Sequence, residues 1–399
     1  MAGSNKNLAI LFLCQILFMS NNSLLVTVGG LVGLDLAADK ALATMPITSA
    51  VVGTALMAIP ASLMMRRLSR RTGFMLGALI GLAGGLAAAY GVFARSFWLL
   101  AAGSLVIGMY VAFAQLYRFA AAESVSEALR PRAISLVLLG GVGGGYLGPQ
   151  LAKVTIDLIP ETPFLGPYFA VTGLAMVALA LLSQLDLPPP AQDRGAAEAR
   201  PLLTIMRSPV FFVAALSGML GYLVMALIMT GTPLAMVSMG HSLPDAASVI
   251  QWHLIGMFLP SLFTGRLVAH VGVVPVLFAG SVLQLASVGI ALSGIGWFHF
   301  VGALALLGVG WNFLFIAAST LLTKAHTPAE RAKTQAVNDF LIFATVAAAA
   351  LSAGQLLHHF GWRAVLLASL VAAALVLLLT VWAGLREFTG RRRAIAPGG

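Results

Sequence analysis

Charged residues and cysteines are scarce in this sequence of 399 residues. Only 9% of the residues are charged and 60% are hydrophobic, whereas soluble domains average about 25% charged and about 45–50% apolar residues. A water-soluble fold of this length cannot hide so much apolar surface from water. The single cysteine, Cys14, excludes a disulfide framework and a multi-thiolate metal site. A lipid bilayer is therefore predicted to be the solvent for much of the chain.

Acidic residues are fewer than basic ones, and the net charge is +10. Such a balance can indicate nucleic-acid binding, but a basic interface needs a water-facing domain, and no polar stretch here is long enough to form one. The sequence also lacks a nucleotide-binding Gly-x-x-x-x-Gly-Lys loop and a nucleophile–base pair beside an aqueous site. We therefore expect no enzyme, no bound cofactor and no nucleic-acid partner.

Twelve segments have the length and hydropathy of membrane-spanning helices, which need about 20 residues each. The first runs on past the length of a signal-peptide core, so we expect it to remain in the protein. The twelve lie near residues 8–33, 43–65, 73–93, 97–118, 133–154, 163–183, 209–231, 246–268, 272–293, 297–321, 334–357 and 363–385. The proline-rich, charged stretch between spans six and seven is typical of a linker. We predict an all-α membrane protein with a six-helix bundle at 1–185, a cytoplasmic linker at 186–208 and a second six-helix bundle at 209–399.

Basic residues predict the orientation of these spans. If both termini are cytoplasmic, all of the 23 Lys and Arg except Lys40, Arg95, Lys153 and Arg363 fall in cytoplasmic segments. This distribution satisfies the positive-inside rule strongly. The positive charge is therefore explained by topology.

The two halves of the chain are related by a single offset in sequence. Under it Ser62 aligns with Ser261, Gly73 with Gly272, and Trp98 with Trp297. Duplicated six-helix units joined by a polar linker resemble the major facilitator superfamily over the whole chain. The loop signature of that superfamily is partly kept from Gly265 to Gly272, whereas the first copy, Ser62 to Arg71, lacks the usual acid. The resemblance implies two six-helix bundles and alternating access around a cavity lined by spans one, four, seven and ten.

Amide side chains at membrane depth are candidates for the cavity wall, because burying polarity in lipid is costly. They are Asn21 and Asn22 in span one, Gln115 in span four and Asn312 in span ten. Hydrogen bonding between helices explains them equally well. The glycine-rich segment that ends at Gly148 and Pro149 resembles a motif of drug–proton antiporters, although close helix packing is the simpler explanation. Span four carries no arginine in its middle, which weakens the antiporter hypothesis.

Soft metal ligands occur in spans seven and eight. Met225 and Met229 are spaced by four, as are His253 and Met257, so each pair shares one helix face. Met229 and His253 are equally distant in sequence from His241 in the outer loop, and so are Met225 and Met257. On an antiparallel hairpin the four side chains would form two rungs at matching depths. Thioether and imidazole ligands suit copper, particularly Cu(I), whereas a core histidine with packing methionines is the alternative.

Within the superfamily, this Met-x-x-x-Met and His-x-x-x-Met pattern resembles the CcoA-type bacterial copper importers. That resemblance implies copper as the transported substrate, Met225, Met229, His253 and Met257 as its ligands, and supply of copper for assembly of cbb3-type cytochrome oxidase. It also implies a monomer in the bacterial inner membrane and a cytoplasmic copper chaperone as partner. Gly310 to Phe313 and Asn338 to Phe340 are shared with a sister group that resembles riboflavin transporters. Uptake of riboflavin or another small organic solute is therefore the alternative, followed by multidrug–proton antiport.

Two further roles are predicted outside the main site. Met236, Met239 and His241 in the outer loop offer donors that could collect copper, although ordinary loop packing also explains them. Asp339, early in span eleven, is a candidate for proton coupling, because carboxylates inside a membrane are usually functional. Its alternative role is to stabilise a helix N-terminus.

Overall fold

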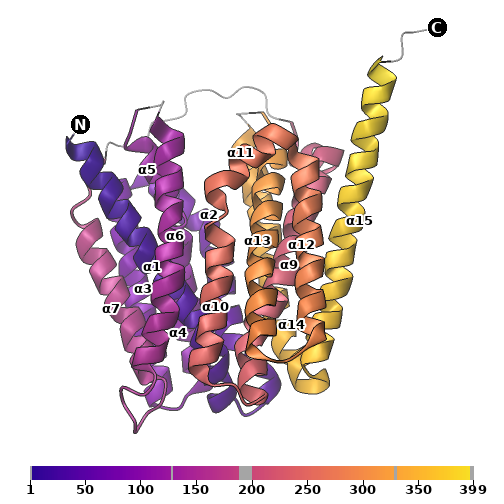
Figure 1. Ribbon diagram of the computed structural model, residues 1–399. Coiled ribbons are helices and arrows are strands. Elements are labelled where there is room, and N and C mark those ends of the chain that lie inside the picture. The colour runs from indigo at the N-terminus through magenta and orange to yellow at the C-terminus, as the bar shows by residue number, and fades with distance from the viewer. Residues whose placement is uncertain (1, 127–128, 188–199, 328–329, 396–399) are drawn as a thin grey trace.

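Twelve helices are long and apolar enough to cross a membrane in the computed structural model, which describes residues 2–126, 129–187, 200–327 and 330–395. No strand occurs within these ranges. The helices form two groups that lie side by side, one from each half of the chain (Figure 1). The predicted all-α class and the number of spans are confirmed. The protein is a multi-pass membrane protein.

The first half contains spans one to six. Its helices are α1 (Ala2–Leu36), α2 (Met45–Arg67), α3 (Arg70–Phe93), α4 (Phe97–Ala114), α5 (Tyr117–Glu123), α6 (Arg130–Thr155) and α7 (Leu165–Leu182), with a short 3-10 helix η1 (Lys40–Leu42). Together α4 and α5 form span four, which continues to Glu123 rather than ending at residue 118 as predicted. The other spans of this half begin and end close to the expected positions.

The second half repeats this order. Its helices are α8 (Leu202–Met206), α9 (Pro209–Ser238), α10 (Leu243–Phe258), α11 (Ser261–Val271), α12 (Val273–Ser293), α13 (Trp297–Leu322), α14 (Arg331–Phe360) and α15 (Trp362–Ile395). Span eight consists of α10 and α11, and the break between them falls at Pro260, whose ring cannot donate a backbone hydrogen bond. Residues 188–199 of the predicted linker lie outside the described ranges, and its last part includes α8.

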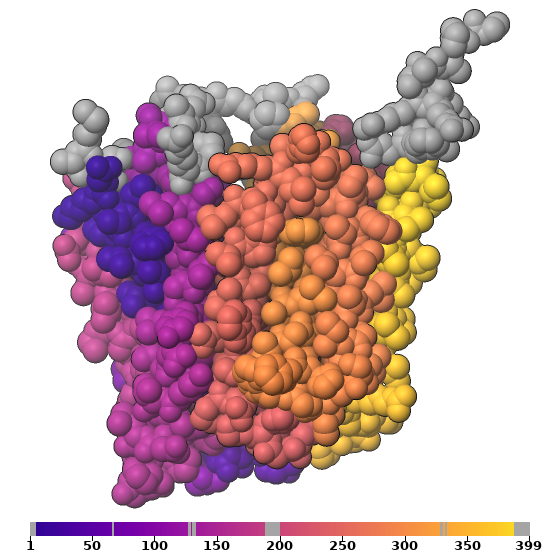
Figure 2. Space-filling model, viewed as in Figure 1, coloured from indigo at the N-terminus to yellow at the C-terminus, as the bar shows by residue number. Residues whose placement is uncertain are grey.

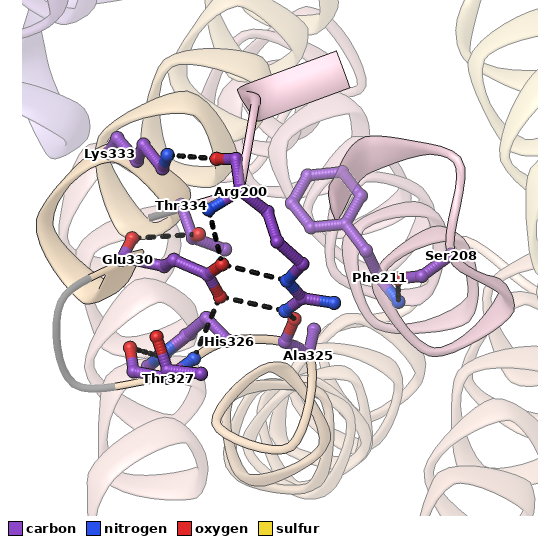
Figure 3. Close-up of polar contacts among 9 residues, drawn as sticks. All are labelled: Arg200, Ser208, Phe211, Ala325, His326, Thr327, Glu330, Lys333 and Thr334. Carbon is purple, nitrogen blue, oxygen red and sulfur yellow. Dashed lines mark hydrogen bonds and ion pairs between the residues drawn. The ribbon is translucent and has the colours of Figure 1, made fainter. Parts of the chain in front are cut away.

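Both ends of the linker are bonded to their own half of the molecule. Asn7 in α1 donates to the carbonyl of Asp186 (2.6 Å) and accepts from its N–H (3.1 Å). At the other end, Arg200 binds both carboxylate oxygens of Glu330, each at 2.7 Å, and Lys333 donates to the Arg200 carbonyl (Figure 3). Such a bidentate pair fixes geometry as well as charge. Asp186 and Arg200, on either side of the central part of the linker, are therefore each hydrogen-bonded to their own half of the molecule.

Close backbone contacts hold neighbouring helices together. A Cβ atom at Gly108 would lie 1.8 Å from the carbonyl oxygen of Ala50, so α4 and α2 meet with no room for a side chain. In α6, the Gly144 carbonyl accepts a hydrogen bond from Ser23 of α1 (2.9 Å), and a Cβ at Gly148 would lie 1.9 Å from the Ser23 hydroxyl. Small residues serve this purpose where lipid provides no hydrophobic driving force. The glycine-rich segment before Pro149 is thus a packing surface for α1.

The outer surface of the bundle is apolar, as a bilayer requires. Figure 2 shows one face, formed by α6, α10, α12 and α13. Large apolar side chains are exposed on these second-half helices, among them Trp252, Phe278 and Phe298, which is 81% exposed. Large exposed apolar patches mark surfaces that contact a membrane or a partner protein. Here they face the expected lipid.

The two halves meet at one end of the molecule. The chain termini lie at the opposite end, which we call the terminal side, and the meeting end is the far side (Figure 1). On the far side Leu31, Ala43 and Leu234 form one buried cluster that joins the halves. Gln355 of α14 also donates to the carbonyl of Ala41 (3.1 Å). The far side is therefore closed between the halves.

Candidate functional site

A cavity of about 250 Å³ lies between the two halves. Spans one, four, seven and ten line it, as the sequence analysis expected, and α2 and α14 supply further wall. It reaches from Gly29 and Pro46, near the far side, to Arg118 and Phe343, nearer the terminal side. A concave site of this kind, enclosed by helices from both halves, is where a transported solute can bind.

The wall from the first half is rich in hydrogen-bonding groups. Asn22 and Gln115 line the cavity, as predicted, and Gln15, which the sequence analysis did not single out, lies with them. Two further lining residues, Ser104 and Tyr168, carry buried hydroxyls that lie close enough to interact with one another. Pairing of this kind offsets the cost of burying polar groups.

Asn21 does not line the cavity, although it adjoins Asn22 in sequence. It is only 3% exposed, and neither end of its amide has a partner within the described part of the chain. Helical geometry turns successive side chains by about 100°, which explains why the two neighbours point differently.

Arg118 is a second cavity-lining residue that the sequence analysis did not single out. Helix α4 ends at Ala114, the chain turns at Gln115 and Leu116, and α5 carries the span onward. Arg118 lies in this second piece and lines the cavity, with its guanidinium carbon 4.9 Å from the centre of the Phe119 ring. The sequence places Arg118 at the end of span four, whereas in the structure the span continues five residues further, to Glu123. The arginine still lies near the end of the span and not in its middle, so the sequence argument against antiport is unchanged.

The wall from the second half is aromatic. The rings of Trp311 and Phe315 are stacked, with centroids 5.0 Å apart and an angle of 6° between their planes. Tyr222 and Phe258 meet the indole edge to face, at 5.1 Å and 6.4 Å. All four residues line the cavity, and the indole N–H of Trp311 has no partner within the described residues. Flat rings of this kind are suited to contact with a planar solute.

Three of the four predicted copper ligands lie on the same wall. Met225, Met229 and Met257 are buried together and line the cavity. His253 is fully buried and does not line the cavity. Its Nδ1 lies 2.7 Å from the carbonyl oxygen of Leu304 in α13. The structure thus brings the thioethers together and directs one nitrogen of the imidazole to a neighbouring helix. That arrangement resembles the core-histidine alternative.

Asn312 lies at the break in span eight and not in the cavity lining. Its amide nitrogen donates to the Met257 carbonyl (2.7 Å) and to the Ser261 hydroxyl (2.6 Å), and its oxygen accepts from Thr264 (2.7 Å). The side chain therefore bridges α13 to both α10 and α11. Of the two explanations considered for this residue, the structure matches hydrogen bonding between helices.

The outer-loop residues are largely occupied by packing. Met236 is fully buried, and Met239 packs against the core of the second half. The Nε2 of His241 lies 2.8 Å from the carbonyl oxygen of Ile295, and its ring meets Phe300 edge to face at 5.7 Å. Met236 consequently offers no exposed thioether, and the structure does not present the three side chains together as an open capture site.

Asp339 lies inside α14, which begins eight residues earlier at Arg331. The helix dipole acts within the first turn, so stabilisation of a helix N-terminus does not explain this carboxylate. Asp339 accepts a hydrogen bond from Asn338 (3.2 Å) and lies near enough to Arg118 for their charges to interact. Its role in proton coupling stays a prediction.

Comparison with known proteins gives consistent matches along the whole chain. The sequence profile of the Major Facilitator Superfamily matches residues 11–260 and 219–397. The chain is 43% identical over 380 residues to the riboflavin transporter RfnT of Brucella anthropi, covering 94% of this chain and 96% of that protein. It is 30% identical over 373 residues to YdeG of Bacillus subtilis, an uncharacterized MFS-type transporter, covering 90% and 87%.

Solved structures resemble this fold at low sequence identity. The nucleoside transporter NupG superposes with a TM-score of 0.78 at 13% identity, over 94% of this chain and 99% of that chain. The human organic anion transporter MFSD10 (TETRAN) gives a TM-score of 0.68 at 14% identity, over the same shares. These two likenesses concern the fold alone.

Proposed function

This chain belongs to the major facilitator superfamily of transporters, and from that premise we propose that it takes up a riboflavin-type solute through its central cavity. The resemblance to the superfamily is confirmed by the family match, whereas the resemblance to copper importers stays a prediction. Riboflavin-type here means a flat heterocycle that carries many hydrogen-bond acceptors. This substrate was the alternative in the sequence analysis, and it is now the better supported one.

The observation that carries the proposal is the division of the cavity into two unlike walls. Trp311 and Phe315 present stacked rings from the second half, and Gln15, Asn22 and Gln115 present amides from the first. A planar heterocycle can stack on the rings while the amides bind its edge. The cavity, at about 250 Å³, is much larger than a bare ion needs and close to the lower end of small-molecule pockets, about 300 Å³.

The similarity to RfnT supports the same substrate class. RfnT is named a riboflavin transporter, and the two chains align over nearly their full lengths. Because the alignment spans both halves, it covers every helix that lines the cavity. The proposal therefore has one argument from geometry and one from similarity.

Copper import is the second candidate, and it has one observation in its favour. Met225, Met229 and Met257 line the same cavity, and thioethers are suitable ligands for Cu(I). Against it, His253 is bonded to α13 and does not line the cavity.

Uptake assays distinguish the two substrates. In bacteria that cannot make riboflavin, expression of this chain should restore growth on low external riboflavin and should drive accumulation of the labelled vitamin. Accumulation of labelled copper without riboflavin uptake would overturn the proposal in favour of the second candidate. The same cells expressing Trp252→Ala, which alters a lipid-facing side chain, provide the matched control.

Binding measurements then test the aromatic wall directly. Replacing Trp311 with alanine removes the stacking surface, and we expect the dissociation constant for riboflavin to rise roughly tenfold, since such stacking contributes about 1–1.5 kcal/mol. Trp311→Phe keeps a ring and should lose less affinity. Quenching of flavin fluorescence on titration with purified protein provides the measurement. Equal affinity of parent and Trp311→Ala would contradict the assignment of the wall.

A further inference from the structure

One positive and one negative side chain lie near each other toward the terminal side of the cavity. Arg118 belongs to α5 of the first half and Asp339 to α14 of the second. The two groups lie within electrostatic range of one another and of the hydroxyl of Tyr222 in α9. The group therefore draws on three helices and on both halves of the protein.

Helix periodicity places both charges in line with the cavity wall. The lining residues Phe343 and Val346 follow Asp339 by four and seven positions, so all three share one face of α14. Arg118 follows the lining residue Gln115 by three positions and itself lines the cavity. Arg118 therefore lines the cavity, and Asp339 lies about one helical turn beyond the lining residues of α14, toward the terminal side.

Arg118 is not bound to a carboxylate within the described residues, unlike other arginines of this protein. Arg70, at the start of α3, makes an ion pair of 2.6 Å with Glu123, and Arg200 is held by Glu330. Arg118 instead lies over the Phe119 ring, and its Nε is buried without a hydrogen-bond partner. A buried N–H without a partner is costly, so this arginine of the cavity wall is a candidate for binding a solute.

The chemistry of the two groups defines what they select. A guanidinium presents several N–H donors in a rigid planar fork, which fits the acceptor-rich edge of a heterocycle. A carboxylate next to it repels anions, and specificity commonly depends on such a repulsive element. The charges of Arg118 and Asp339 together sum to zero. A neutral solute can therefore accept hydrogen bonds from Arg118, while Asp339 offsets the attraction that Arg118 alone would have for an anion.

We propose that Arg118 binds the acceptor edge of the transported heterocycle, and that Asp339 excludes its anionic derivatives. The cavity would then accept the uncharged solute and reject its phosphate ester. This inference rests on the proposed function and adds a charge rule to it. Arg118 is a specificity-determining residue in direct contact with substrate, and Asp339 acts on the substrate through charge alone.

Equilibrium binding to the purified full-length protein tests the inference without involving transport or its driving force. Quenching of flavin fluorescence would be titrated with riboflavin and with riboflavin 5′-phosphate. Arg118→Gln should weaken riboflavin binding tenfold or more, and Arg118→Lys should recover only part of the loss, because lysine lacks the fork. Asp339→Asn should improve the affinity for the phosphate, relative to riboflavin, by tenfold or more. Arg95→Gln, which alters an exposed arginine paired with Asp35 outside the cavity, is the control.

The outcomes separate this inference from the proposed function. A parent protein that does not bind riboflavin overturns the proposed function and the inference together. A parent that binds riboflavin while Arg118→Gln binds it equally well overturns the inference alone, as does Asp339→Asn that discriminates against the phosphate as strongly as the parent. If Arg118→Gln fails to elute as a single species on size exclusion, Arg118→Lys decides in its place, and affinity equal to that of the parent counts against the inference.

Discussion

Replacing Asn312 with leucine should destabilise the protein without altering the chemistry of the cavity. The substitution is close in size, and it removes two donated hydrogen bonds and one accepted bond at the break in span eight. Hydrogen bonds between membrane helices contribute about 0.6 kcal/mol each on average. The Met257 carbonyl is additionally left without this donor, and an unsatisfied buried group costs about 1–3 kcal/mol. We therefore expect a loss of about 3–5 kcal/mol in the free energy of unfolding.

Asn22→Leu provides the matched comparison for this experiment. Asn22 is an amide in the cavity wall, so its replacement should weaken solute binding while leaving the free energy of unfolding nearly unchanged. Reversible unfolding in mixed micelles gives the stability, and flavin quenching gives the affinity. If Asn312→Leu unfolds within about 0.5 kcal/mol of the parent, the bridging role of Asn312 is refuted. A loss of affinity in Asn312→Leu without a loss of stability would return this residue to the cavity wall.

Three further predictions concern other parts of the molecule. Arg200 and the Thr327 N–H lower the pKa of the Glu330 carboxyl far below its usual range. The ionised carboxylate therefore contributes fully to stability above about pH 4.5, and this contribution declines as the pH falls below that value. The melting temperature of Glu330→Gln should lie below that of the parent at neutral pH and approach it in acid. Gly108→Val should prevent accumulation of folded protein, because no space exists beside Ala50, whereas Gly173→Ala, with nothing within 4 Å, should express normally. A reporter enzyme fused to the C-terminus should be active only in the cytoplasm, and periplasmic activity would contradict the predicted orientation.

The sequence was sufficient for the spans and their duplication, because membrane-length apolar runs and repeated glycines are visible without coordinates. It was not sufficient for span four. Neither Gln115 nor Leu116 is a typical helix breaker, so nothing in the sequence indicated that a second helical piece would carry Arg118 into the cavity wall. In span eight Pro260 did offer a breaking signal, but the partner that stabilises the break, Asn312, lies on another span and only the fold brings it there.

The methionine and histidine pattern shows a different limit. A spacing of four places His253 and Met257 on a common face of α10, but it does not say which neighbour that face meets. In the structure Met257 reaches the cavity, whereas the His253 ring is held by the Leu304 carbonyl of α13. The two side chains share one face of α10 but have different neighbours, because α13 packs against His253. The spacing therefore predicted that the two residues share a helix face, whereas only Met257 of the two lines the cavity.

The break in span eight, between α10 and α11, lies beside the cavity. On the far-side segment, Leu254 and Phe258 of α10 press against glycines of α6, so this piece is in contact with the first half. Beyond the break, α11 is bonded through Thr264 to Asn312 of α13, and the same Asn312 binds the Met257 carbonyl of α10. Both pieces are therefore held to the second half, and α10 also packs against the first. Because Met257 and Phe258 end α10 and also line the cavity, a solute bound there would lie directly beside the break.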